Sequence, residues 1–166
     1  MIVLEDYKRN TGGYVKRFLW AFRKSQATKS HVMRLFYRCC LRRYRLKYGL
    51  EIPWETKIGK GLYLGHAFNI TINRNSVIGD YCNIHKGVVI GMQNRGAKQG
   101  CPTIGDKVWI GINAAIVGGI HVGDDVLIAP NSFVNCDIPP HSVVFGNPCQ
   151  IHHRDNATEG YINNID

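Results

Sequence analysis

The 166-residue sequence lacks any hydrophobic run of about 18 residues, the length that a membrane-spanning helix requires. Its N-terminus, MIVLED, lacks the basic start and long apolar stretch of a secretory signal peptide. Its six cysteines never show the Cys-x-x-Cys spacing of a zinc site, and their spacings indicate no disulfide framework. These absences predict a cytoplasmic protein with reduced thiols and no bound metal.

Acidic residues are scarce in one part of the chain only. Residues 1–50 contain 13 Lys and Arg against Glu5 and Asp6, a formal charge of +11, whereas the remaining 116 residues sum to −2. No nucleic-acid-binding motif accompanies this charge, so we expect no nucleic-acid partner. Two interpretations stay open: a solvated basic face, or a patch that contacts anionic lipid head groups or polyphosphate-bearing substrates, with the protein peripheral at a membrane surface.

The basic segment 1–50 is predicted to be helical. Val15, Phe18, Leu19 and Phe22 share one face of a helix over residues 14–24. The linker 25–30 supplies an N-cap for a second helix from about His31 to Tyr48, and Gly49 ends it. One side of this second helix carries Arg34, Arg38, Arg42 and Arg45.

Beyond this segment, an aliphatic residue recurs every six positions. The positions are Ile58, Leu64, Ile72, Ile78, Ile84, Ile90, Ile104, Ile110, Ile116, Val122, Ile128 and Val134. Glycine follows at every third repeat, at positions 59, 79, 105 and 123, so the full unit is 18 residues. This period predicts a triangular coil of three short strands, and we expect these glycines to provide the backbone angles of a corner.

The repeat is interrupted twice, and it ends at two prolines. Two extra residues lie between Leu64 and Ile72, and the polar, glycine-rich segment 91–103 is predicted to be an exposed loop, where function commonly concentrates. Pro139 and Pro140 cannot donate to a further ladder, so we expect them to end the stack. The predicted organisation is a helical segment 1–50, a coil domain 51–151 and a tail 152–166.

The repeat, the loop exit Cys-Pro-Thr-Ile-Gly (101–105) and the ending Pro-Pro-His-Ser-Val-Val-Phe-Gly-Asn-Pro (139–148) resemble the hexapeptide-repeat acyltransferases. The resemblance covers residues 50–151 and is to the serine acetyltransferase-like branch, especially its short exopolysaccharide members of the colanic-acid type. It implies a left-handed parallel β-helix of about four coils, a homotrimer, and acetyl-CoA as co-substrate. It also implies an active site in the cleft between neighbouring subunits.

The resemblance assigns the catalytic roles. The family's catalytic His follows a repeat aliphatic residue, and the matching position is His66, at the first interruption. A general base should titrate near neutral pH, which suits an imidazole. Glu51 matches the acid that orients this base, and the alternative is a surface carboxylate. His85, outward-facing after a repeat aliphatic, is the second candidate.

The cofactor contacts that the resemblance implies are mostly backbone groups at small residues. The matching positions are Gly91, Met92, Gly111, Ile112, Ala129 and Pro130. Lys107, with Lys98 and Arg154 as alternatives, is a candidate for contact with the 3′-phosphate.

The acceptor is expected near Gly65, Asn94, Arg95 and Cys101. In serine acetyltransferases, an Asp and an Arg-His pair bind the charged ends of the amino acid, and the matching positions here are Gly65, Gly100 and Cys101. Each missing charge-assisted contact contributes about 1.5–3 kcal/mol, which favours a neutral acceptor. We therefore predict transfer of acetyl to a sugar hydroxyl of a polysaccharide or its precursor. The alternatives are serine O-acetylation and a non-catalytic scaffold.

Overall fold

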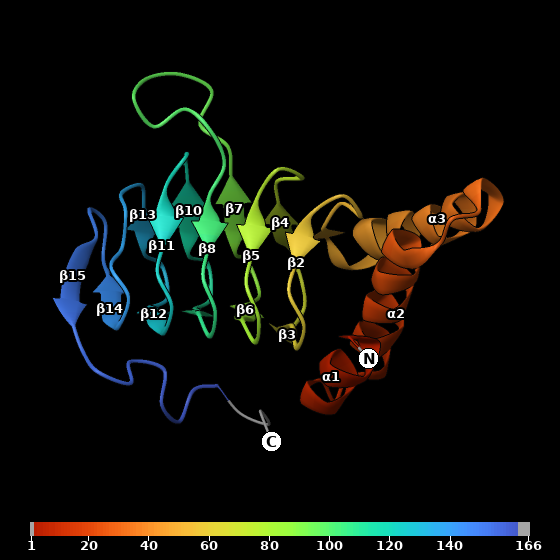
Figure 1. Cartoon of the computed structure of the whole chain (residues 1–166), viewed down its shortest axis with the longest axis horizontal. Helices are drawn as coiled ribbons and strands as arrows, with labels where there is room; N and C mark the ends of the chain where they lie inside the picture. Colours follow the sequence, from red (N-terminus) through yellow and green to blue (C-terminus); the bar gives the residue numbers. More distant parts are fainter. Residues whose placement is uncertain (1, 163–166) are drawn as a thin grey trace.

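The computed structural model describes residues 2–162, which form a three-sided prism of short strands with helices at one end (Figure 1). Sheet A holds β1 (Leu50–Glu51), β4 (Ile70–Ile72), β7 (Val89–Gly91), β10 (Ala115–Val117) and β13 (Phe133–Val134). Sheet B holds β2 (Lys57–Ile58), β5 (Val77–Ile78), β8 (Thr103–Ile104) and β11 (His121–Val122). Sheet C holds β3 (Tyr63–Gly65), β6 (Asn83–His85), β9 (Trp109–Ile110), β12 (Val126–Ile128), β14 (Ser142–Phe145) and β15 (Gln150–His153).

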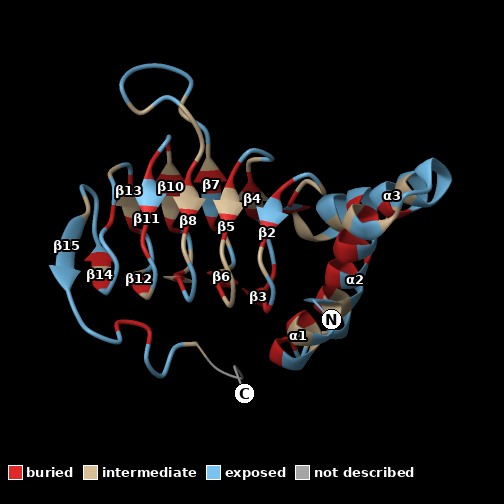
Figure 2. Cartoon of the chain, in the orientation of Figure 1, coloured by how far each residue is buried: buried red, intermediate tan, exposed pale blue. Residues whose placement is uncertain are grey.

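The repeat aliphatic residues stack directly above one another inside the prism. In sheet A, Ile72 pairs with Ile90, Ile90 with Ile116, and Ile116 with Val134, and all are buried (Figure 2). Each buried side chain of this size contributes about 1.5–3 kcal/mol. The predicted parallel β-helix is confirmed, with five strands in sheet A and four in sheet B, where about four coils were predicted.

The glycines at the repeat corners have a different role from the one predicted. Gly59, Gly79 and Gly105 do not adopt left-handed backbone angles. A Cβ at Gly79 would instead lie 2.5 Å from the carbonyl oxygen of Gly105, and one at Gly59 would lie 2.6 Å from that of Gly79. The coils therefore approach too closely for a side chain here, while Tyr81 and Lys107 take the left-handed angles nearby.

The prediction that the two prolines end the stack is wrong for sheet C. After Pro140, β14 pairs in parallel with β12 and extends that sheet by one strand. Sheet B does stop, because beyond β11 only Ile138 forms an isolated bridge, to Val122. The last strand, β15, turns back antiparallel to β14 and closes the end of sheet C.

Three helices precede the prism: α1 (Ile2–Arg9), α2 (Gly13–Ala27) and α3 (His31–Tyr48). Helix α3 has the predicted bounds, with Ser30 Oγ accepting from the Met33 N–H at 3.4 Å and Gly49 left-handed at φ 64°. Helix α1 was missed, and α2 is longer than predicted at both ends. Within residues 2–162, none of these helices is both long and apolar enough to cross a membrane.

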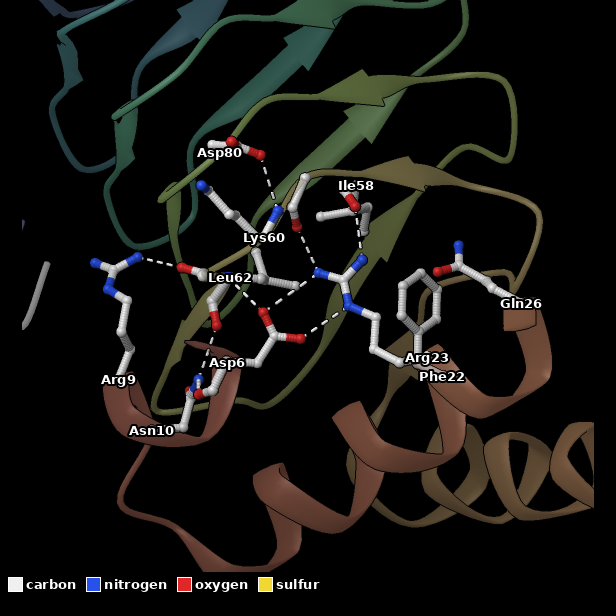
Figure 3. A network of polar contacts seen from close by, with 12 residues as sticks. Asp6, Arg9, Asn10, Phe22, Arg23, Gln26, Ile58, Lys60, Leu62 and Asp80 are labelled. Atoms are coloured by element: carbon white, nitrogen blue, oxygen red, sulfur yellow. Dashed lines mark hydrogen bonds and ion pairs between the residues drawn. The ribbon is translucent and has the colours of Figure 1, made fainter. Parts of the chain in front are cut away.

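Buried polar side chains attach α1 and α2 to the first coil (Figure 3). Asp6 accepts from the backbone N–H of Leu62 at 2.9 Å and from Arg23 Nε at 2.8 Å. Asn10 Oδ1 accepts from the Leu64 N–H at 3.0 Å. The first coil has no preceding coil to pair with, so helix side chains satisfy these backbone groups instead. We call Asp6, Asn10 and Arg23 the helix–coil joint.

Candidate functional site

The chain turns from sheet C into sheet A at one edge of the prism, which we call the C–A edge. Segments 66–69, 86–88, 111–114 and 129–132 make these turns, one per coil. Several predicted site residues therefore stack along this edge or end the strand that enters it: Gly65, His66, His85, Gly111, Ile112, Ala129 and Pro130.

The remaining predicted site residues lie elsewhere. Gly91, Met92, Asn94, Arg95 and Cys101 lie at the A–B edge, where the loop after β7 projects from the prism (Figure 1). Lys107, exposed and with φ 53°, turns the chain from sheet B into sheet C, at the third edge. Within one chain, the width of sheet A thus lies between the candidates at the C–A edge and those at the A–B edge.

His66 is exposed and has a left-handed φ of 50°. Other turns of the prism have the same left-handed angle, for example at Tyr81 and Lys107, so it is a property of the coil and does not by itself mark a site. Glu51, its predicted orienting acid, is paired instead with Arg45, at 3.5 Å between Oε1 and Nη1. Within one chain, the predicted contact between Glu51 and His66 is therefore not formed.

His85 has a defined tautomer. Its Nδ1 lies 2.9 Å from the Ile110 carbonyl oxygen, which only accepts, so Nδ1 carries the proton and Nε2 is free to accept one. Burial lowers the pKa of His85, and the nearby His66 lowers it further, against a raising contribution from the Ile110 hydrogen bond. His85 is consequently a neutral imidazole at neutral pH.

Gly65 makes room for the His85 ring. The two residues are direct partners in the pairing of β3 with β6. A Cβ at Gly65 would lie 2.6 Å from His85 Nε2. No side chain can therefore be added at Gly65 while the imidazole keeps its place, and the free Nε2 faces the residue that precedes His66.

Aromatic rings hold His85 in this position. Trp109, one coil further on, lies 4.7 Å from the His85 ring between centroids, and Tyr63 on the other side lies 6.0 Å away. The tail adds Tyr161, whose ring centroid lies 5.1 Å from that of Trp109. The Tyr161 carbonyl accepts from Asn83 Nδ2 at 3.0 Å. Sequence reasoning missed Trp109, which pairs in register with Asn83, two residues before His85 on the same face of β6.

The small residues predicted to contact acetyl-CoA are small for different reasons. A Cβ at Gly111 would lie 2.6 Å from the Pro130 nitrogen, so this glycine is required by the packing of its own coils. At Gly91, the nearest atom to a Cβ would be Val117 Cγ2 at 3.8 Å, which leaves ordinary space. Gly91 therefore has room that Gly111 lacks, and Met92 and Pro130 are exposed among the predicted cofactor positions of the two edges.

The loop 92–102 is anchored at its base. Gln93 and Gly100 exchange two backbone hydrogen bonds of 3.0 Å, and Lys98 pairs with Asp137 at 3.0 Å. Cys101 donates to Asn73 Oδ1 at 3.3 Å, and burial raises the pKa of its thiol, so it is poorly suited as a nucleophile. Asn94 and Arg95 are exposed near the loop tip.

All six cysteines are free thiols, including the buried Cys82. Within residues 2–162, no cluster of three His, Cys, Asp or Glu side chains is arranged to hold a metal ion.

The sequence shares its repeat with a known family. Residues 101–136 match the family described as bacterial transferase hexapeptide (six repeats). The chain is 38% identical over 98 residues to serine acetyltransferase from Helicobacter pylori, covering 59% of this chain and 57% of that relative. It is 32% identical over 110 residues to serine acetyltransferase from Synechococcus elongatus, covering 66% and 45%. The chain thus spans about half the length of these curated relatives.

Solved serine acetyltransferase structures have a similar fold. The Neisseria gonorrhoeae protein in complex with serine matches with a TM-score of 0.74 at 27% identity, covering 91% of this chain and 66% of that chain. The soybean apoenzyme gives 0.74 at 26% identity, covering 85% and 58%. The predicted resemblance to hexapeptide-repeat transferases is supported, by the sequence match over residues 101–136 and by the similar fold. The predicted exopolysaccharide branch is not supported, because these relatives are serine acetyltransferases.

Proposed function

We propose that this hexapeptide-repeat chain is an O-acetyltransferase that moves an acetyl group from acetyl-CoA to a hydroxyl. The observation that carries the proposal is the pair of imidazoles, His66 and His85, at one edge of a prism that is similar to serine acetyltransferases. A base at this edge removes the proton from the hydroxyl as its oxygen attacks the thioester carbonyl. The tetrahedral intermediate then expels the CoA thiolate, which takes the proton from the imidazolium.

His66 is the proposed base, since it matches the family's catalytic position and is open to solvent. His85 is proposed to accept a hydrogen bond from the acceptor hydroxyl through its free Nε2. Its Nδ1 bond to the Ile110 carbonyl fixes the tautomer, so no reorientation is needed when an acceptor binds. Its lowered pKa keeps it neutral, which suits a hydrogen-bond acceptor.

We propose that the complete site needs a second copy of the chain, in the homotrimer that the family resemblance implies. The C–A edge carries the imidazoles, whereas the A–B edge carries Gly91, Met92 and the loop. A neighbouring subunit that places its A–B edge against this C–A edge brings both groups to one cleft. The same packing would give His66 a carboxylate such as Glu51 from another subunit.

The basic contact to the 3′-phosphate of CoA is better assigned to Lys98 than to Lys107. Lys98 lies on the A–B edge with Gly91 and Met92, whereas Lys107 lies on the third edge, away from both groups. Lys98 is already paired with Asp137, so a phosphate there would replace or share that partner.

L-serine is the acceptor that the comparisons favour, because the relatives and the solved structures are serine acetyltransferases. A neutral sugar hydroxyl remains a second candidate on one specific observation. His85 occupies the space over Gly65, so a carboxylate cannot be presented there to an ammonium group. A neutral imidazole nitrogen in that place suits a hydroxyl donor.

The reaction is tested by acceptor-dependent release of the CoA thiol from acetyl-CoA. We expect His66→Ala to lower kcat by about 10²–10⁴, the usual contribution of a general base. His121→Ala is the matched control, because His121 is exposed on β11 of sheet B. Activity of His66→Ala within a few-fold of the unaltered protein would move the role of base to His85.

The acceptor is decided by comparing L-serine with free and nucleotide-linked hexoses in the same assay. Turnover with serine alone supports the favoured acceptor, and turnover with hexoses alone supports the second candidate. Absence of acetyl-CoA binding at millimolar concentration would reject both and leave the scaffold alternative.

A further inference from the structure

Helix α3 exposes an apolar stripe on the face that points away from the protein. Val32 is 77% exposed, Leu35 60%, Phe36 54% and Leu46 76%, and Cys39 between them is also exposed. Their spacing of three, four and seven residues places them on one side of the helix. In the cartoon of Figure 2, α3 is drawn mostly in the pale blue of exposed residues.

Basic residues border this stripe on both flanks. At 100° per residue, Arg38 and Arg42 lie along one flank, Lys47 lies along the other, and Arg43 lies within the stripe, between the angles of Cys39 and Phe36. All four are exposed, and the sequence of α3 contains no acidic residue. Residues of the stripe and of both flanks line an open depression of about 480 Å³: Cys39, Arg42, Arg43, Leu46 and Lys47.

The opposite face of α3 is already used for packing. Tyr37 and Leu41 are buried, and Tyr44 and Tyr48 contact rings of α2, with centroids 5.7 Å from Phe18 and 4.6 Å from Tyr14. The protein core therefore does not need the outer stripe. In Figure 1, α3 extends outward at the end of the prism, and the high exposed fractions of the stripe show that the described chain does not cover it.

The nearest carboxylates lie between α3 and the first coil. Glu51 and Glu55 line a neighbouring cavity of about 400 Å³ there, which the stripe residues Leu35 and Cys39 also line, together with Arg38, Arg42 and Arg45. Glu51 pairs with Arg45. Glu51 and Glu55 thus face the inner flank of α3. Arg43 and Lys47 do not line this cavity and have no acidic neighbour in it.

We propose that the outer face of α3 binds the surface of an anionic lipid bilayer. The apolar stripe would enter the boundary between head groups and acyl chains, and the flanking Arg and Lys side chains would contact lipid phosphates. This arrangement is typical of helices that lie in a membrane interface. A second copy of the same face is a poorer partner, because it would oppose like charges across the contact.

The proposal goes beyond acetyl transfer and does not depend on it. Binding through α3 would hold that end of the prism at the membrane. The C–A and A–B edges would then face the cytoplasm or a lipid-linked acceptor. Loss of membrane binding and loss of acetyl transfer are separate results, because α3 lies outside the proposed site.

Co-sedimentation with vesicles tests the proposal on the full-length protein. The vesicles contain equal parts of phosphatidylglycerol and phosphatidylcholine, with pure phosphatidylcholine as the comparison. We expect Arg42→Glu with Arg43→Glu to lower the partition coefficient by about tenfold or more, since each basic residue near an anionic surface contributes several-fold. Leu35→Ser with Leu46→Ser should lower it as well, and high salt should weaken binding by the unaltered protein.

The matched control reverses the same charge elsewhere. Arg17 and Lys24 are exposed on α2, and Arg17→Glu with Lys24→Glu changes the net charge by the same amount. Equal loss of binding in this control would reject a specific role for α3, as would absence of binding to anionic vesicles. A change of oligomeric state in the α3 variants, measured by light scattering, would assign the face to a protein contact instead.

Discussion

The prism and the helical segment are stabilised in different ways. In the prism, identical aliphatic residues stack coil upon coil, and the buried side chains of its interior are almost all apolar. The helical segment also shares apolar side chains such as Phe18 and Phe22 with that core, but in addition it meets the prism through buried ionic and polar groups, with Asp6 fully buried and Arg23 6% exposed. Its last helix, α3, exposes apolar side chains of the kind that are buried inside the prism. A repeated unit can bury what it repeats, whereas the end of a repeat needs a special partner.

The largest expected effect is a loss of stability when the helix–coil joint is altered. Asp6→Ala removes the carboxylate that Arg23 Nε and the Leu62 N–H contact. An uncompensated buried charge remains, so we expect the free energy of unfolding to fall by about 3–5 kcal/mol in urea titration. Glu5→Ala is the control, because its pair with Lys8 is partly exposed, and it should change stability by at most about 0.5 kcal/mol. Similar values for the two variants would show that the joint contributes little.

A second expected effect compares glycines of the two regions. Gly79→Ala would place a Cβ 2.5 Å from the Gly105 carbonyl oxygen, so we expect a loss of about 1–3 kcal/mol from displaced coils. Gly13→Ala, at the start of α2, meets nothing within 4 Å and should leave stability unchanged or raise it by up to about 1 kcal/mol. Thermal unfolding of both variants measures the difference, and equal effects would contradict the close approach of the coils.

The smallest expected effect is on the pH dependence of stability. Its sign differs between His85 of the prism and Asp6 of the helix–coil joint. The folded pKa of His85 lies below its ordinary value of 6.5, mainly through burial, so the unfolded chain binds the proton more readily. The contribution of His85 to stability is therefore complete above about pH 6.5 and is lost as the pH falls below it. Burial raises the pKa of Asp6, so the folded state binds that proton more readily and acidification favours folding there.

Urea titrations at pH 8 and pH 5.5 check this difference. His85→Gln keeps a polar side chain but does not titrate, so it should show a smaller loss of stability on acidification than the unaltered protein. An equal loss in both proteins would mean that His85 ionises as freely in the folded state as in the unfolded chain.

Much of the fold could be predicted from the sequence, because equivalent positions of a six-residue repeat have the same environment in every coil. The bounds of α3 followed from Ser30 and Gly49, whose capping roles are local. Helix α1 was missed because its stability comes from distant partners, such as the backbone of Leu62, that a local pattern does not contain. The extension of sheet C beyond Pro140 was missed for a similar reason, since pairing continues with residues after the prolines.

The candidate site was less accessible to sequence reasoning. His66 and His85 were singled out by their places in the repeat, and the structure places both at the C–A edge. The dependence of His85 on Gly65 and on the Ile110 carbonyl emerges only when β3, β6 and β9 lie side by side. Glu51 and Lys107 matched family positions in the sequence, yet neither lies at the C–A edge within one chain.

By itself, the sequence determined the prism, its period and the places of His66 and His85 in the repeat, because the period of the side chains can be read directly from the order of the residues. Only the tertiary structure decided which edges of the prism the candidates share, why the corner glycines are required, and which face of α3 stays exposed. These depend on distances between residues one coil or more apart, and such distances are set by packing rather than by spacing along the chain.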